Sequence, residues 1–527
     1  MTRATSGPKR EAGQQRFAGH APGSVWARWR AVRRLVQVLS LGLFLFLLSA
    51  SLQRPALLAQ AALYFRLDPL MALAAMVADR AWLPGLGLAL GTLLLTMLVG
   101  RVWCGWLCPL GTVLEWTSPR SARQRAQHLS PRWRMVKHWL LALLVAGAFF
   151  GNLTLVALDP LAILLRTVAV ALLPALAWAV TAVEAALYTL APLQQSVDRL
   201  EGLLRGPILP VEQPAFLQSG LIAGLLVVIV ALNALAERFW CRYLCPLGAL
   251  LGMFSRVALL RPVIGRACHR CGHCDTVCPL GAVDAARDYT VVAAECTLCL
   301  DCLAECPEQG GGLRLRLWPE PAREYDLSRR HLLGALGAGA LGTALLRTEA
   351  STKARHPLLL RPPGVEDEAA FVSRCLRCGA CLKVCPTSGL QPVLLEAGLE
   401  GIWTPRLVPR LGYCDYGCNA CGQVCPSGAI PPLDLETKRG RVIGLAAVDR
   451  NRCLPWAYDV PCIVCEEMCP VPEKAISLEE VTVIGPGGNP IALQRPHVRQ
   501  ELCVGCGICE KRCPMEGQAA IRVYRYR

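Results

Sequence analysis

Of the 28 cysteines in this chain of 527 residues, 24 fall into six groups of four, and each group ends in Cys-Pro. Four groups have the spacing C-x2-C-x2-C-x3-C-P: Cys268, Cys271, Cys274, Cys278; Cys296, Cys299, Cys302, Cys306; Cys375, Cys378, Cys381, Cys385; and Cys503, Cys506, Cys509, Cys513. Two are longer at the first gap: Cys414, Cys418, Cys421, Cys425; and Cys453, Cys462, Cys465, Cys469. Cysteines this close on one turn do not readily form disulfides with each other, and structural zinc sites usually use two separated pairs. The pattern instead predicts [4Fe–4S] clusters, up to six, with these 24 cysteines as ligands.

In two-cluster ferredoxins the fourth cysteine of each motif binds the neighbouring cluster. We therefore expect Cys306 to complete the cluster of Cys268, Cys271 and Cys274, and Cys278 to complete that of Cys296, Cys299 and Cys302. For the last four groups, sequential and nested pairings are both open. The long gap after Cys453 either shapes a special cluster environment or is a tolerated loop.

The other four cysteines belong to an internal repeat. Asp68-Pro69-Leu70 precedes W-C-G-W-L-C-P-L-G, which holds Cys104 and Cys108, and Asp159-Pro160-Leu161 precedes W-C-R-Y-L-C-P-L-G, which holds Cys241 and Cys245. A spacing of four residues puts both sulfurs of a pair on one face of a helix. The four thiols are candidates for a metal cluster, a redox thiol pair or a quinol site, against the alternative of two helix ends with free thiols. The aspartates suit helix N-caps before proline, and no catalytic role is assigned to them.

Charge and hydropathy both divide the chain into two halves. Residues 1–266 hold 26 Lys and Arg against 10 Asp and Glu, whereas the two kinds balance in residues 267–527. Four apolar stretches of bilayer length lie in the first half: Leu35–Leu52, Trp82–Gly100, Trp139–Leu158 and Phe216–Ala236. Basic residues gather before the first stretch, between the second and third, and after the fourth, which predicts that these segments are cytoplasmic. This alternation favours membrane topology over nucleic-acid binding.

The insertion at residues 162–218 must then cross the membrane zero or two times. Its apolar part is interrupted by Pro174 and carries Arg166 and Glu184, so we expect a helix pair lying on or in the outer face. Further along, Ser328-Arg329-Arg330 precedes an apolar run of 15 residues, Leu332–Leu346, which is typical of a twin-arginine export signal used as an internal signal-anchor. The alternative is a soluble helix that links two cytoplasmic modules.

No C-x-x-C-H motif and no credible nucleotide motif occurs, so neither covalent haem nor nucleotide chemistry is expected. The fold prediction is an α-helical membrane domain, with four core transmembrane helices as a tandem repeat, plus ferredoxin-like α+β iron–sulfur domains. The predicted boundaries are a basic N-terminus (1–34), the transmembrane domain (35–260), a two-cluster domain (261–320), the signal-anchor (326–347), a linker (348–368) and a four-cluster domain (369–527).

Residues of about 30–310, with the paired C-x3-C-P motifs and two cluster motifs, resemble the NapH-type membrane ferredoxins of periplasmic nitrate reduction. Residues of about 326–527, with S-R-R-H-L-L and four cluster motifs, resemble the NapG-type and MauM-type exported ferredoxins. The resemblance implies a quinol dehydrogenase in the bacterial inner membrane, which passes electrons from the quinol pool to a periplasmic reductase or cytochrome c. Two alternatives are an accessory ferredoxin for maturation or regulation of a periplasmic redox enzyme, and a membrane polyferredoxin facing only the cytoplasm.

Overall fold

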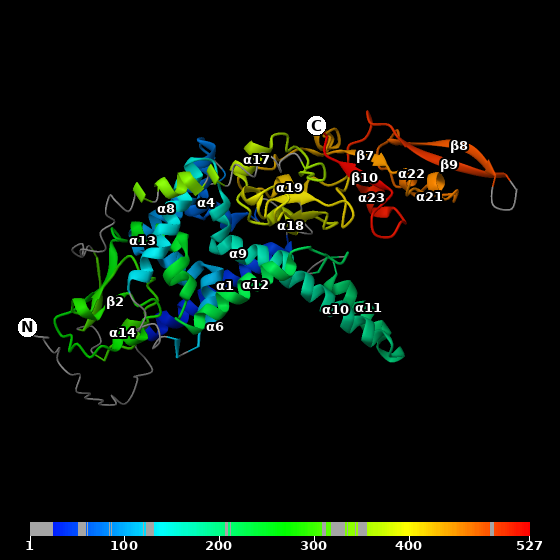
Figure 1. Cartoon of the computed structure of the whole chain (residues 1–527). Helices are drawn as coiled ribbons and strands as arrows, with labels where there is room; N and C mark the ends of the chain where they lie inside the picture. The colour runs from blue at the N-terminus through cyan, green and yellow to red at the C-terminus, as the bar shows by residue number, and fades with distance from the viewer. Residues whose placement is uncertain are drawn as a thin grey trace, which may run out of the picture.

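The computed structural model describes residues 25–50, 60, 62–83, 85, 87–119, 121–122, 131–205, 209–210, 212–307, 312–317, 333–345 apart from 335 and 343, 356–484 and 490–526. A helical domain lies in the middle of the molecule, and the cysteine groups are carried by a first block (residues 260–317) and a second block (residues 356–526) (Figure 1). The basic N-terminal segment before Val25 and the twin-arginine motif at 328–330 lie outside the described residues.

The helical domain packs the two sequence repeats around one apolar core, which includes Phe65, Leu70, Leu110, Leu161 and Leu247. Its helices are α1 (Val25–Ala50), α3 (Leu63–Arg66), α4 (Pro69–Asp79), α5 (Ala89–Val99), α6 (Pro109–Thr117), α8 (Met135–Phe149), α9 (Pro160–Thr167), α12 (Ser219–Ala231) and α13 (Pro246–Ser255).

The two Asp-Pro motifs start equivalent helices. Asp68 Oδ1 accepts the backbone N–H groups of Leu70 and Met71 at 2.8 and 3.2 Å, and Asp159 Oδ1 accepts those of Leu161 and Ala162 at the same two distances. Each following proline takes a position at which its missing N–H costs no helical hydrogen bond. The predicted N-cap role of both aspartates is therefore confirmed.

Two helices are long and apolar enough to cross a membrane, judged by length and composition: Val25–Ser49 and Pro160–Tyr188. The first coincides with α1. The other three predicted spans form α5, α8 and α12, whose α-helical parts have 11, 15 and 13 residues. At 1.5 Å per residue these parts are shorter than the roughly 30 Å hydrocarbon core. Glycines with positive φ, Gly100 after α5 and Gly151 after α8, help to end two of them, so four full-length spans are not confirmed.

The insertion is more continuous than its sequence indicates. Helix α9 runs through a π-helical turn, Val168–Leu172, into α10 (Leu173–Tyr188), and Pro174 occupies the first turn of α10. The helix is therefore not broken at Pro174, and the π-helical turn directly before it is a local change of hydrogen bonding of the kind that accommodates a proline inside a helix. Helix α11 (Gln194–Leu204) returns along α10, and Arg205 bonds Glu184 at 2.8 Å (Figure 1).

Short strands and helical turns build the first block. Its strands pair antiparallel, β1 (Leu260–Ile264) with β4 (Leu313–Leu317) and β2 (Val283–Asp284) with β3 (Thr290–Val291). The helices α14 (His273–Val277) and α15 (Asp301–Ala304) each lie inside a cysteine motif and carry its third cysteine, Cys274 and Cys302 respectively. This is the ferredoxin-like α+β arrangement expected for two motifs of this spacing.

The second block repeats this construction twice. Its antiparallel strand pairs are β5 (Leu390–Pro392) with β6 (Pro405–Leu407), β7 (Leu445–Val448) with β10 (Ile521–Tyr524), and β8 (Ile476–Ile484) with β9 (Pro490–Val498). Its helices are α17 (Glu368–Arg374), α18 (Ala380–Val384), α19 (Ala420–Gln423), α20 (Leu435–Arg439), α21 (Leu454–Ala457), α22 (Val464–Glu467) and α23 (Ile508–Arg512). Residues 358–367, placed in a linker by the sequence, pack into this block: Leu359 and Leu360 are buried, and Arg361 pairs with Glu368.

The two blocks contact opposite ends of the helical domain (Figure 1). At the start of α8, Lys137 bonds Glu295 of the first block at 2.5 Å, and both side chains are 1% exposed. Arg101, just after α5, donates to the Ala294 carbonyl at 2.8 Å. This buried charge cluster fixes the loop that carries the second cysteine motif against the helices.

The second block is held by polar contacts at the other helix ends. Arg166 of α9 donates to the Arg377 carbonyl at 3.1 Å and stacks on the Trp403 ring with 3.8 Å from its guanidinium carbon to the ring centroid. Gln218, just before α12, donates to the Pro392 carbonyl at 2.8 Å. Arg374 pairs with Asp79 at the end of α4.

The segment at residues 333–345 is helical where described and lies along α8. Gly334 faces Trp139 near the start of α8, and a Cβ on Gly339 would overlap Ala146 near its end. The segment therefore runs from the end that holds the first block toward the end that holds the second.

We predict that Lys137→Met destabilises the protein by about 3 kcal/mol, because Glu295 keeps its burial and loses its closest cation. Thermal unfolding of the purified protein measures this, and limited proteolysis should release the first block earlier. The control is Arg287→Gln, which removes an exposed ion pair with Asp284 and should cost less than about 1 kcal/mol. Equal losses in the two variants would contradict the role given to the buried pair.

Candidate functional site

Five cavities in the two blocks are each lined by four cysteines. The groups are group 1 (Cys268, Cys271, Cys274, Cys306), group 2 (Cys278, Cys296, Cys299, Cys302), group 3 (Cys375, Cys378, Cys381, Cys425), group 4 (Cys385, Cys414, Cys418, Cys421) and group 5 (Cys453, Cys462, Cys465, Cys513). Five cavities with the same four-cysteine lining fit copies of one cofactor.

The remaining four cysteines of the 24 form group 6: Cys469, Cys503, Cys506 and Cys509. Electrostatic interactions join Cys506 to both Cys469 and Cys503, and join Cys509 to Cys503 and Cys506. Every group thus takes three cysteines from one motif and the cysteine before proline from another. The exchange expected in the first block is the one the structure has, and the second block pairs its motifs sequentially, third with fourth and fifth with sixth.

Four exchanged sulfurs have a common environment. Each accepts a backbone N–H from a residue further along the chain: Cys278 from Ala282 at 3.1 Å, Cys425 from Ile430 at 3.4 Å, Cys469 from Ala475 at 3.3 Å, and Cys513 from Ala520 at 3.4 Å. Hydrogen bonds to cluster sulfurs stabilise thiolate ligands and adjust reduction potential.

The chemistry of these groups fits a polynuclear cluster better than a single ion. Among the described residues, no three His, Cys, Asp or Glu side chains converge tightly enough to hold one metal ion. Burial raises the pKa of the Cys414 and Cys465 thiols to about 12. Both are therefore neutral at pH 7 without a cofactor, and cluster iron must displace their protons to be ligated.

The groups follow one another through the molecule. Exchange makes neighbours of groups 1 and 2, of groups 3 and 4, and of groups 5 and 6. The Cys414 backbone N–H donates to the Cys506 carbonyl at 2.8 Å, which places group 4 beside group 6. Group 2 faces the helical domain through Leu298, whose carbonyl accepts from Trp106 Nε1 at 2.9 Å. Group 3 faces it from the other end through Arg377. The order is therefore 1, 2, helical domain, 3, 4, 6, 5.

The helical domain brings the four remaining thiols together. Cys104, Cys108, Cys241 and Cys245 are all buried, and electrostatic interactions connect both Cys108 and Cys245 to Cys104 and Cys241. The expected helix face is wrong in detail: residues 103–107 and 240–244 are π-helical turns, and Cys108 and Cys245 are extended N-cap residues of α6 and α13. The proline after each cysteine requires this break, since it starts a new helix.

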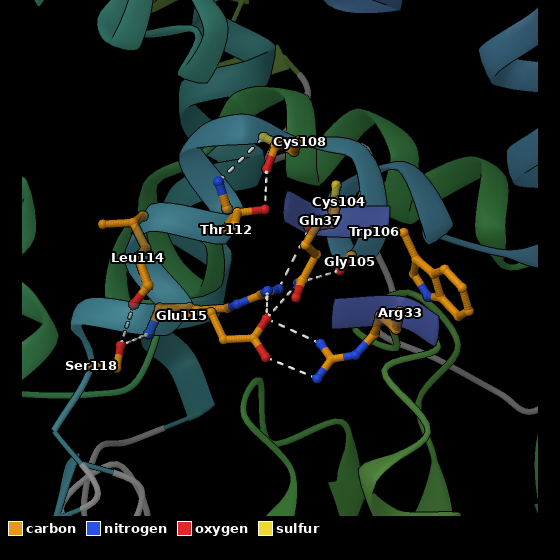
Figure 2. A network of polar contacts seen from close by, with 12 residues as sticks. Arg33, Gln37, Cys104, Gly105, Trp106, Cys108, Thr112, Leu114, Glu115 and Ser118 are labelled. Carbon is orange, nitrogen blue, oxygen red and sulfur yellow. Dashed lines mark hydrogen bonds and ion pairs between the residues drawn. The ribbon is translucent and has the colours of Figure 1, made fainter. Parts of the chain in front are cut away.

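A polar network lies beside this thiol group (Figure 2). Glu115 of α6 accepts from Arg33 at 3.0 Å and from Gln37 at 2.8 Å, and it also pairs with Arg238. Gln37 donates to the Gly105 carbonyl at 2.9 Å. The network thus ties α1 and the segment after α12 to the first thiol motif.

Nothing in the spacing of residues along the chain predicts that the two N-cap aspartates meet. Asp68 and Asp159 are fully buried, and their side chains interact electrostatically with each other. Asp159 also interacts electrostatically with Cys108 and Cys245. Only the repeated Asp-Pro-Leu motif, read as a pair rather than as two caps, could have indicated this contact.

The cysteine groups and their folds define an iron–sulfur electron-transfer protein of the ferredoxin type. A family model described as a 4Fe-4S binding domain matches residues 81–127 and 217–266, and a second model of that description matches residues 496–516. No solved structure matches the chain.

Among curated relatives, the MauM methylamine utilization ferredoxin-type protein of Methylorubrum extorquens is 37% identical over 209 residues, which are 38% of this chain and 91% of the relative. The ferredoxin-type protein NapG of Escherichia coli is 38% identical over 36% of this chain and 79% of its own. MauN of Methylorubrum extorquens is 26% identical over 48% of this chain and 75% of its own. The chain belongs to the MauM/NapG family of ferredoxin-type proteins. The resemblance of its first half to NapH-type proteins stays a prediction.

We predict that iron content reveals the sequential pairing. Cys378 and Cys425 line one cavity, so Cys378→Ser, Cys425→Ser and the double variant should each lose about four iron atoms per chain. Cys421 lines a different cavity, so Cys421→Ser combined with Cys425→Ser should lose about eight. Iron and acid-labile sulfide analysis of anaerobically purified protein measures both. Nested pairing would make the first double variant lose more iron than either single variant.

Proposed function

We propose that this protein is a membrane-bound quinol dehydrogenase component that carries electrons through six [4Fe–4S] clusters to a periplasmic reductase or cytochrome. The observation that supports this proposal is the position of the cysteine groups at opposite ends of an apolar helical domain. Groups 1 and 2 lie at the end that holds the described basic residues Arg101, Lys137 and Arg238, and groups 3 to 6 lie at the other end. An electron path that crosses the bilayer needs cofactors on both sides, and the chain has cysteine groups at both ends of its helical domain.

The proposed topology keeps the first block in the cytoplasm and the second block outside. The segment at 333–345, which follows the twin-arginine motif, extends along α8 from one end toward the other. Clusters are assembled in the cytoplasm, so a signal that exports folded protein suits the second block. Two of the relatives are named as a methylamine utilization ferredoxin-type protein and as the ferredoxin-type protein NapG, which supports an electron-transfer role for the second block.

We predict that alkaline phosphatase fused after Arg527 is active in cells, because the second block is exported. Fusion after Leu317, at the end of the first block, should be inactive. The measurement is phosphatase activity normalised to fusion protein level. An inactive C-terminal fusion of normal abundance would contradict export and favour a polyferredoxin that faces only the cytoplasm.

We also predict that the purified protein is reduced by a menaquinol analogue. The visible absorbance of its oxidised clusters should fall on addition of the quinol, and the low-temperature EPR signals of reduced clusters should rise. Dithionite serves as the control that all clusters are reducible. Clusters that dithionite reduces and the quinol leaves oxidised would contradict the dehydrogenase proposal and favour an accessory role.

A further inference from the structure

The four thiols of the helical domain do not belong to any of the six cysteine groups. We propose that Cys104, Cys108, Cys241 and Cys245 together ligate one further iron–sulfur cluster, shared between the two repeats, which relays electrons between group 2 and group 3. Neither family match in this region contains more than one of the two cysteine pairs. A four-thiolate site therefore requires both repeats, and the fold supplies it.

The first support is the hydrogen bonding of the sulfurs. Gly111 N–H donates to Cys108 Sγ at 3.5 Å, and Gly248 N–H donates to Cys245 Sγ at 3.2 Å. In the two blocks, four other cysteines that precede proline also accept a backbone N–H, and all four lie in cluster groups. In the helical domain this bond is also the N-cap of the following helix, so what these C-P sulfurs share with the cysteines of the blocks is the accepted backbone N–H.

The second support is a set of buried donors that lack acceptors. Arg238 Nε, Trp103 Nε1 and Trp240 Nε1 are buried and have no hydrogen-bond acceptor within the described part of the chain. The two tryptophans directly precede Cys104 and Cys241, and a Cβ on Gly248 would lie 2.8 Å from Arg101 Nη2. Orphaned buried donors are costly, and the sulfur atoms of an anionic cluster are acceptors that would satisfy them.

The third support is that a simpler occupant does not fit. The four thiols are not joined by a disulfide, and no described group of side chains is arranged to hold a single metal ion. Arg101 and Arg238 are at most 1% exposed, and they interact electrostatically with Cys104 and Cys241 respectively. Two buried guanidinium groups offset the negative charge that four thiolates bring to a cluster.

The position of the thiols suits a relay. On one side, Arg238 interacts with both Cys241 and Cys299 of group 2, and the Thr297 backbone packs so closely on Gly105 that a Cβ there would overlap it. On the other side, α9 starts at Asp159 beside Cys108 and Cys245, and its Arg166 lies next to Cys378 of group 3. Seven residues of helix cover about 10 Å between these contacts.

The relay step is a one-electron exchange. A reduced neighbouring cluster gives one electron and is oxidised, the shared cluster is reduced, and the electron then passes to the cluster on the other side. No bond is formed or broken. The relay role depends on the proposed function, whereas the ligand assignment does not, and the following experiment tests the ligands without a quinol.

Native mass spectrometry of the anaerobically purified full chain counts clusters directly. We expect seven in the wild type and six in Cys108→Ser/Cys245→Ser, with the mass difference showing whether the lost cluster is [4Fe–4S] or [2Fe–2S]. The control is Thr96→Val, a buried change in α5 that should keep seven. If the double variant does not accumulate, Cys245→Ser alone keeps three thiols and should change one EPR signal.

Several outcomes would overturn the assignment. Equal cluster counts in the wild type and the double variant would do so. A wild type with six clusters and a mass about 4 Da lower would indicate two disulfides and a thiol relay. A bound zinc or copper ion at the four thiols would also refute an iron–sulfur cluster. A seven-cluster protein that no quinol reduces would leave the site intact and refute only the dehydrogenase.

Discussion

The exchange of the cysteine that precedes proline is the interaction on which the architecture depends. Each group takes three sulfurs from one short motif and a fourth from a second motif, so neither motif can complete a site alone. The exchange fixes the two motifs of a pair around neighbouring cavities with little regular secondary structure to help. Strands of two to five residues are enough for most of the scaffold because the sulfur positions supply the long-range constraint.

In the helical domain, too, residues from two separate motifs meet at one place. Its repeats are joined by side chains that meet at equivalent positions: Asp68 with Asp159, and Cys104 and Cys108 with Cys241 and Cys245. Where the repeats differ, the neighbouring block explains the difference. The first motif has Gly105 where the second has Arg242, because Gly105 lies against the backbone of Thr297 and no side chain fits. Asymmetric docking of the first block on a symmetric core therefore accounts for this change.

Buried charge holds the parts in place. The Lys137, Glu295 and Arg101 cluster at one end, and Arg166 on Trp403 at the other, are isolated from water and tolerate little displacement. Such contacts give geometric specificity more than net stability, since the cost of removing both charges from water offsets most of their attraction. Fixed geometry is what a series of electron carriers requires, because transfer depends on the separation of neighbouring sites.

The sequence alone determined the grouping of 24 cysteines into six motifs, the exchange within the first block, the helix-starting role of the two Asp-Pro motifs and the division into an apolar half and a cysteine-rich half. These follow from local spacing and composition. The sequential pairing of the second block, the π-helical turns at the C-x3-C-P motifs, the meeting of Asp68 with Asp159 and the inclusion of residues 358–367 in the second block were decided only by the tertiary structure. Each depends on which distant segments pack together, and the spacing of residues along the chain does not determine that packing.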